Sequence, residues 1–180
     1  MFNFFKKKDP VTKVIDKVLM SEESKFASLY REWQSDPAAV LVFWFEETLD
    51  AAAAYFAGKG ANKPTMIMTR EANTQQLLGK KIFFAEHYPL HSKEQLLFEK
   101  LHLGTVTVYS SLTEPLFKEF GSDRIIQMMK QLGMKEDEVV EHKMITSSIR
   151  NAQEKIEKKM GSEFNASSQA DWLKKNFTAG

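Results

Sequence analysis

The sequence has no cysteine among its 180 residues, which excludes a disulfide framework, a cysteine nucleophile and any metal site with cysteine ligands. It also lacks an excess of either charge, since 25 Lys and Arg stand against 24 Asp and Glu. General nucleic-acid binders need a concentrated basic surface, so we expect no nucleic acid among its partners. With 43% hydrophobic and 27% charged residues, the composition is typical of a soluble globular domain.

Long apolar runs are absent too. The longest, residues 38–45, is far shorter than the roughly 18 residues of a membrane-spanning helix. The N-terminus places aromatic residues before its lysines, the reverse of a secretory signal, so we expect a cytoplasmic protein. Residues 1–9 are expected to be a flexible terminus whose only membrane contact is weak and reversible. That contact would use Phe2, Phe4, Phe5, Lys6, Lys7 and Lys8.

What is present is an alternation of strand-like and helix-like segments from residue 38 to 110. The apolar runs predict strands at 39–45, 65–69, 81–85 and 105–109. Helical patterns predict helices at 46–57, 71–78 and 92–102, the last with a capping box made by Ser92 and Gln95. This order predicts an α/β fold, a three-layer αβα domain with a mostly parallel sheet of about four strands.

Helical segments flank this alternation on both sides. Two N-terminal helices are expected, the first opened by Pro10 and carrying Val11, Val14, Ile15, Val18 and Leu19 at helical spacing, the second capped near Ser21. Further helices are predicted at 113–120, 122–132 and 141–160. We expect residues 10–160 to form a single domain with a helical extension at 111–160. A linker and a short C-terminal helix would occupy 161–180.

Motifs for catalysis or metal binding are incomplete. The segment 58–65 resembles a phosphate-binding loop but has Lys63 and Pro64 where that loop needs glycine and lysine, and it follows a helix instead of a strand. His87 and His91 are four apart, yet a proline separates them. A triad of Ser110, His87 and Glu46 remains an alternative without a nucleophile elbow around the serine. We expect no metal and no cofactor.

Geometry offers a candidate ligand site where motifs do not. Ligands of open parallel sheets bind beyond the carboxyl ends of the strands. Those ends supply a polar rim of mixed charge, and the same residues also suit the capped starts of helices. The candidate rim residues are Trp44, Glu46, Arg70, Glu86, His87, Ser110 and Ser111.

Residues 108–160 resemble a known family. The phrases Phe120-Gly-Ser-Asp-Arg-Ile125, Leu132-Gly-Met134, Glu141-His-Lys-Met144 and Asn151-Ala-Gln153 follow one another as they do in SecA, the motor ATPase of bacterial preprotein translocation. A weaker similarity in the same order covers residues 38–107. The resemblance implies the end of a second RecA-like motor domain and the start of a helical scaffold.

The resemblance also shows which parts of the family are missing from this sequence. The first motor domain, with its P-loop and magnesium-binding motif, is absent, and the helix 92–100 lacks the arginines with which the family contacts nucleotide. We therefore expect no ATP hydrolysis, and a non-catalytic SecA-like module that binds a protein partner, accessory to protein translocation. The expected partner surface is Met144, Ile149, Ile156, Trp172 and Phe177. The alternative is a small enzyme, or a sensor of a ligand or nucleotide, that uses the rim.

Overall fold

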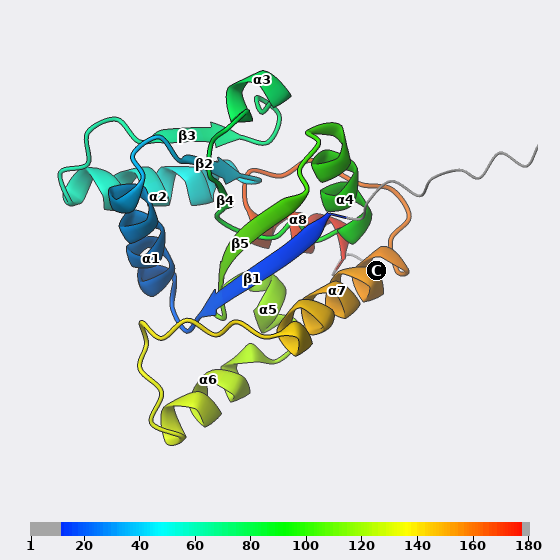
Figure 1. The fold of residues 1–180 in the computed structure, drawn as a ribbon. Coiled ribbons are helices and arrows are strands. Elements are labelled where there is room, and N and C mark those ends of the chain that lie inside the picture. Colours follow the sequence, from blue (N-terminus) through cyan, green and yellow to red (C-terminus); the bar gives the residue numbers. More distant parts are fainter. Residues whose placement is uncertain (1–11, 178–180) are drawn as a thin grey trace, which may run out of the picture.

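The computed structural model describes residues 12–177 and shows an α/β domain built on one five-stranded sheet (Figure 1). All neighbouring strands pair in parallel, in the order β1-β5-β4-β2-β3. The strands are β1 (Lys13–Leu19), β2 (Val40–Phe43), β3 (Thr65–Met68), β4 (Ile82–Phe84) and β5 (Thr105–Ser111). The predicted fold class is confirmed, with one strand more than expected.

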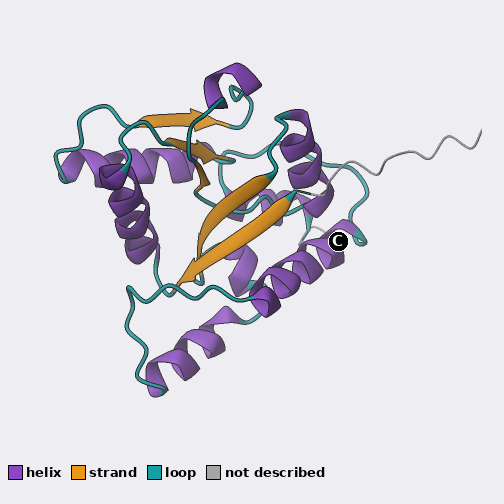
Figure 2. Ribbon diagram, viewed as in Figure 1, coloured by secondary structure: helices purple, strands orange, loops and turns teal. Residues whose placement is uncertain are grey.

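Helices cover both faces of the sheet (Figure 2). Helices α1 (Glu22–Ser35) and α2 (Glu46–Gly58) lie on one face, where Phe26 and Phe56 pack against Leu41 and Phe43 of β2. Helices α3 (Thr74–Leu77) and α4 (His91–Lys100) lie on the other, against the alternate residues of the same strand. Because successive strand side chains point to opposite faces, a continuous apolar run is what a doubly covered strand requires.

The fifth strand, β1, corrects the prediction of a helix over residues 10–20. It pairs in parallel with β5 along its whole length, from Lys13 opposite Thr105 to Leu19 opposite Ser111. Val14 and Val18 are four residues apart, a spacing that fits one face of a helix and equally one face of a strand. The segment is a strand because it pairs with β5, more than 90 residues away, and the local spacing of valines carries no information about this pairing.

Helix ends agree with the sequence at α1 and differ at α4. Ser21 caps α1 by accepting a hydrogen bond from the Ser24 amide at 3.2 Å. The capping box predicted for Ser92 and Gln95 is wrong, because α4 starts one residue earlier, after Leu90, without a side-chain cap. Ser92 instead donates through its amide and hydroxyl to Glu157 of α7, at 2.8 and 2.5 Å.

Three helices follow the last strand and form the extension: α5 (Pro115–Lys118), α6 (Ser122–Gln131) and α7 (Lys143–Glu157). Helix α7 packs beside β1 and α4, on the face opposite α1. The loop before α7 is tied to the sheet by paired backbone hydrogen bonds between Val140 and Val18. These contacts bring α6 and the start of α7 close to the carboxyl end of β1 (Figure 1).

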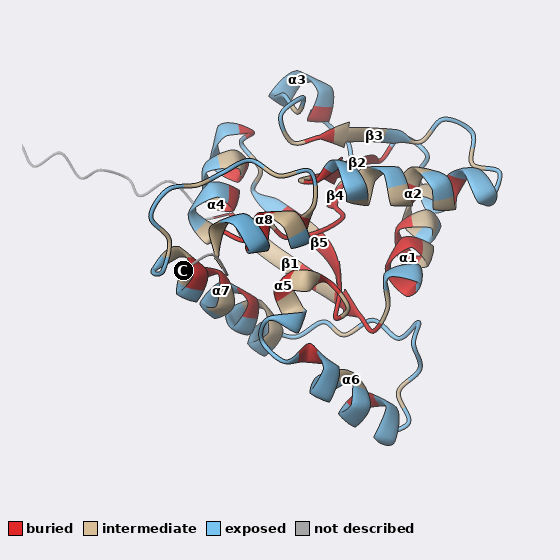
Figure 3. Ribbon diagram, turned by 180° about the vertical axis from the view of Figure 1, so that it is seen from behind, coloured by how far each residue is buried: buried red, intermediate tan, exposed pale blue. Residues whose placement is uncertain are grey.

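The last helix, α8 (Gln169–Asn176), covers the carboxyl edge of the sheet. Strands β2 and β4 are neighbours there, and their following helices leave toward opposite faces, which makes this the switch point where open α/β sheets bind ligands. Trp172 and Leu173 of α8 pack against Phe45 and Leu116 at this edge. Seen from behind, α8 lies on the near side of the sheet (Figure 3).

Within residues 12–177, no helix is long and apolar enough to cross a membrane. The expectations for residues 1–9, including membrane contact by their phenylalanines and lysines, lie outside the described residues.

Candidate functional site

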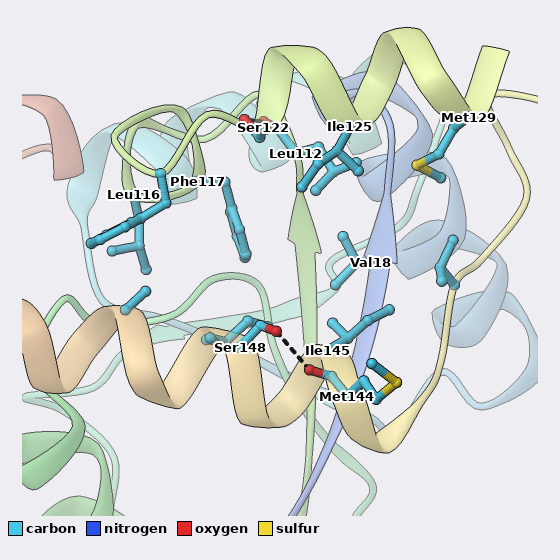
Figure 4. A pocket seen from close by; sticks show the side chains of 14 residues that line it. Val18, Leu112, Leu116, Phe117, Ser122, Ile125, Met129, Met144, Ile145 and Ser148 are labelled. Atoms are coloured by element: carbon cyan, nitrogen blue, oxygen red, sulfur yellow. Dashed lines mark hydrogen bonds between the residues drawn. The ribbon is translucent and has the colours of Figure 1, made fainter. Parts of the chain in front are cut away.

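An apolar groove of about 300 Å³ lies between α5, α6 and α7, at the carboxyl end of β1. We call it the α6–α7 groove. Figure 4 shows Val18 of β1, Ile125 and Met129 of α6 and Ile145 of α7 pointing toward the same space. Its lining is aliphatic, aromatic or methionine, apart from Ser122 and Ser148 and the backbone around them.

The hydroxyls of the two serines in the groove already donate hydrogen bonds to backbone carbonyls of this protein. Ser122 Oγ donates to the carbonyl of Leu112 at 2.5 Å, and Ser148 Oγ donates to the carbonyl of Met144, one helical turn earlier, at 2.8 Å (Figure 4). The groove therefore presents apolar surface without a free side-chain hydrogen-bond donor.

Apolar side chains around the groove remain exposed to solvent. Met144 at the start of α7 is 72% exposed, and Phe120 and Ile125, which also line the groove, are exposed too. Both helices are strongly amphipathic, and each buries only part of its apolar face, through Met129 of α6 and Ile149 of α7. Contiguous exposed apolar surface of this kind marks interaction sites in soluble domains.

The partner surface predicted from sequence is corrected by this burial. Ile149, Ile156 and Trp172 are buried, and Phe177 is half-buried, because α7 packs on β1 and α4 and α8 packs on the sheet edge. Of the five predicted residues, only Met144 is exposed, and it lines the groove.

The candidate rim divides into separate environments. Glu46 and Arg70 form an exposed ion pair at 2.7 Å and line one open pocket together with Trp44. Glu86 and His87 are buried and point into different networks. Ser110 is fully buried with its hydroxyl unpartnered, and Ser111 Oγ bonds to Thr113. The predicted rim is therefore not one site.

His87 lies in a buried charge network. Its Nε2 contacts Asp16 Oδ1 of β1 at 2.7 Å, and its Nδ1 contacts Glu94 Oε1 of α4 at 2.9 Å. Burial alone would lower the pKa of His87, but the two carboxylates outweigh it and raise the pKa well above its usual value. Gln153 of α7 donates to Glu94 at 2.8 Å and so ties the extension to this network.

This network differs from the arrangements that the catalytic triad and a metal site at His87 would need. Both ring nitrogens are occupied by carboxylates, while Glu46 is paired with Arg70, so the triad with Ser110 is not assembled. Among residues 12–177, no group of three or more histidine and acidic side chains is placed to hold a metal ion.

Glu86, two residues after β4, holds the turn that leads from β2 into α2. Its Oε1 accepts hydrogen bonds from the amides of Trp44 and Phe45 at 3.0 and 2.9 Å, and its Oε2 accepts one from the Thr48 hydroxyl at 2.5 Å. Phe45, the N-cap residue, has no side chain that could do this itself. Burial raises the pKa of Glu86 to about 7, against the opposing effect of Lys25.

Lys25 and Glu114 form a second buried pair that the sequence did not indicate. Their Nζ and Oε1 atoms are 2.8 Å apart, and both side chains are almost fully buried. Burial would lower the pKa of Lys25, yet Glu114 and Glu86 raise it. The partners are 89 residues apart in sequence, so no spacing could have paired them.

Comparison with known proteins relates the chain to one family over part of its length. No family model matches the sequence. A stretch of 54 residues, 30% of this chain, is 54% identical to the protein translocase subunit SecA of Acidithiobacillus ferrooxidans. The same length is 48% identical to SecA of Acinetobacter baumannii and of Acinetobacter baylyi. The chain contains a SecA-like segment. The match covers 6% of each of these SecA chains, so this chain spans a small fraction of its relatives.

The match confirms the resemblance to SecA. The residues on which that resemblance was recognised, 108–160, include α5, α6, α7 and most of the groove lining. The groove itself was missed in the sequence, although its helices were predicted. The available signal was the amphipathic pattern of 122–132 beside that of 141–160. Only their placement around Val18 shows that the two apolar faces share one opening.

The raised pKa of Glu86 makes a testable prediction for stability. A buried acid whose folded-state pKa exceeds its unfolded value of 4.5 holds extra protons in the folded state, so the free energy of unfolding falls as pH rises from about 5 to 8. Relative to a Glu86→Gln variant, which keeps the carbonyl acceptor, the wild type should lose about 3 kcal/mol over this range. Urea unfolding of both proteins at each pH measures the difference, and parallel curves would contradict the shift.

Proposed function

We propose that this chain is a non-catalytic protein-binding module, accessory to SecA-type protein translocation, whose α6–α7 groove receives an apolar helix face of a partner protein. The observation that carries the proposal is the groove, with Met144, Phe120 and Ile125 exposed in its lining. The curated relatives are named as subunits of a protein translocase, and this supports translocation as the setting.

The chemistry of the groove favours a helix over an extended peptide. An extended segment brings unpaired amides and carbonyls that must find partners when water is removed. The hydroxyls of Ser122 and Ser148 are engaged with their own chain. A helix satisfies its own backbone and can insert apolar side chains at positions i, i+3, i+4 and i+7. Methionines such as Met128, Met129 and Met144 adapt their shape to such side chains.

The absence of ATP hydrolysis is part of the proposal. The sequence has no complete phosphate-binding loop, and the segment that resembles one is the turn between α2 and β3. The helix α4 carries Lys93 but no arginine, and Lys93 is paired with Glu163. We expect the purified chain with Mg-ATP to release no phosphate above the buffer rate. Turnover that survives further purification would contradict this part.

The groove is tested by a charge introduced at its exposed rim. Because Met144 is 72% exposed, Met144→Glu should leave the free energy of unfolding within about 0.5 kcal/mol of wild type while placing a charge where an apolar partner docks. We expect affinity for the partner to fall at least about tenfold, the effect of roughly 1.4 kcal/mol. Ser147→Glu is the matched control, since Ser147 is exposed on α7 and does not line the groove.

The partner is obtained by site-specific photo-crosslinking in cells. Benzoylphenylalanine at position 144 or 125 should capture the same protein, and at position 147 should not. The captured protein is then purified, and its binding to wild type, Met144→Glu and Ser147→Glu is measured by fluorescence anisotropy. Equal capture at all three positions, or equal affinity for the two variants, would overturn the groove as the binding site.

A further inference from the structure

A small polar chamber of about 120 Å³ lies at the carboxyl edge of the sheet, apart from the α6–α7 groove. Its walls come from the first turns of α1, α2 and α8 and from the loop before α5. Four glutamates line it: Glu22, Glu47, Glu86 and Glu114. Glu86 and Glu114 are 1% and 5% exposed, and Glu22 and Glu47 are exposed.

The hydrogen bonds around the chamber leave an acceptor without a donor. Glu114 Oε1 accepts from Lys25 Nζ at 2.8 Å and from the Ser111 amide at 2.9 Å. Its second oxygen, Oε2, is buried and has no hydrogen-bond partner. The Gln169 side chain bonds to the Leu116 amide and the His87 carbonyl, and not to this oxygen. Glu114 Oε2 is therefore a buried acceptor without a donor.

The excess of negative charge in the chamber favours binding of a cation. The carboxylates of Glu86 and Glu114 share one buried ammonium, that of Lys25, while Glu22 and Glu47 add negative charge from the same walls. Interactions between charges are stronger in a partly buried space than in water. Unlike a simple acidic cluster, this site has a nine-tenths buried carboxylate with one oxygen unpaired.

Size and lining restrict the kind of cation. A volume of 120 Å³ is about that of four liquid water molecules. Ala51, Pro115 and Ala170 supply apolar wall beside the carboxylates. The chamber offers an unpaired acceptor, negative charge and a small space with an apolar wall. A cation with N–H donors and a short alkyl group matches all three, whereas a bulky quaternary ammonium matches only the charge.

We propose that this chamber binds the primary ammonium group of a small amine, which donates a hydrogen bond to Glu114 Oε2. The amine enters between the first turns of α1 and α2, where Glu22 and Glu47 lie. Gln169 and Ala170 of α8 close the other side, so the C-terminal helix forms part of the site.

Binding is linked to protons through Glu86. Its pKa of about 7 reflects burial, with Lys25 of α1 opposing the shift and Glu114 reinforcing it. The other titratable groups that face the chamber are Glu22 of α1 and Glu47 of α2, and α8 contributes none. A bound cation favours ionised Glu86, so amine binding releases a proton and strengthens as pH rises through 7.

The probe for this site is methylammonium chloride added to the full chain. We expect it to raise the melting temperature in a saturable manner, more at pH 8 than at pH 6, while tetramethylammonium chloride at equal concentration does not. Tetramethylammonium has the charge but no N–H donor. An equal shift by both salts, or no shift by either, would overturn the proposal, the second outcome meaning that the chamber holds water alone.

Variants that fill the chamber test whether methylammonium binds there, and they leave every charged residue in place. Ala51→Leu on α2 should weaken methylammonium binding at least tenfold in calorimetric titration, and Ala170→Val on α8 provides a second block should the first fail to fold. Ala54→Leu, on the exposed side of the same helix, is the matched control and should bind as wild type does. Undiminished binding by both folded blocking variants would place the amine elsewhere. The result is independent of the groove, so either proposal can fail alone.

Discussion

Replacing His87 by glutamine is expected to lower the free energy of unfolding by about 3–5 kcal/mol near pH 6, enough to threaten the fold of a domain with ordinary stability. His87 is the shared partner of two buried carboxylates, Asp16 of β1 and Glu94 of α4. Without it, both negative charges stay buried and face each other across the space the imidazole occupied.

The pH dependence of this loss identifies its cause. The pKa of His87 is raised in the folded protein, so its stabilising effect is complete below the unfolded value of about 6.5 and declines as pH rises through the folded value. The pKa of Asp16 is lowered: burial would raise it, but His87 outweighs burial. Its contribution is therefore complete above about 3.8 and declines in more acidic solution. The difference in the free energy of unfolding between wild type and His87→Gln should be largest from about pH 4 to 6.5.

Chemical unfolding followed by circular dichroism measures this difference. His102→Asn is the control, because His102 is exposed and its backbone has a positive φ that asparagine tolerates. It should change the free energy of unfolding by no more than about 0.5 kcal/mol. Adding Asp16→Asn and Glu94→Gln to His87→Gln should recover part of the loss, because no unpaired charge then remains buried. A similar small loss for His87→Gln and His102→Asn would refute the network's role.

Replacing Trp172 by alanine is expected to cost about 3–5 kcal/mol and to release α8 from the sheet edge. Trp172 has no exposed surface. Its ring stacks edge to face on Tyr88 with centroids 5.7 Å apart, and its Nε1 donates to Tyr88 Oη at 2.9 Å. Removing it leaves a cavity among Phe45, Leu116 and Ile156. It also removes the indole N–H that donates to the Tyr88 hydroxyl and to Glu163.

Hydrogen exchange distinguishes release of α8 from general unfolding. In Trp172→Ala, amides of 169–176 should exchange at least tenfold faster than in wild type, while those of β5 keep their protection. Phe164→Ala is the matched control, since it removes an aromatic ring from the same segment at a position 60% exposed. Uniformly faster exchange in all strands would show that α8 belongs to the global folding unit instead.

The sheet was largely readable from sequence, and the functional surfaces were not. Strands β2 to β5 can be predicted from the sequence, because each is a short, largely apolar segment bounded by turn residues and followed by a helix. β1 was misread as a helix, because Val11, Val14, Ile15 and Val18 recur at a spacing that suits a helix. Its central residue, Asp16, is buried. Asp16 is acceptable there because His87, 71 residues later, neutralises it.

Surface predictions failed wherever one amphipathic stripe had to be divided between core and solvent. The stripe of α7 was correct as a pattern, yet Ile149 and Ile156 are buried while Met144, at its start, is exposed. Periodicity reports that a helix has an apolar face. It does not report how far along that face the neighbouring elements reach.

By itself, the sequence determined the α/β class, the order of β2 to β5 with their helices, the absence of cysteine chemistry and the SecA-like segment. These depend on local patterns or on residue identity. The tertiary structure alone decided that β1 is a strand, that α8 covers the carboxyl edge, and that α6 and α7 enclose a groove. Each of these depends on contacts between residues tens of positions apart. From the sequence alone, a glutamate such as Glu114 is expected to lie on the surface. In the folded protein Glu114 is buried against Lys25, and one of its two carboxylate oxygens has no hydrogen-bond partner.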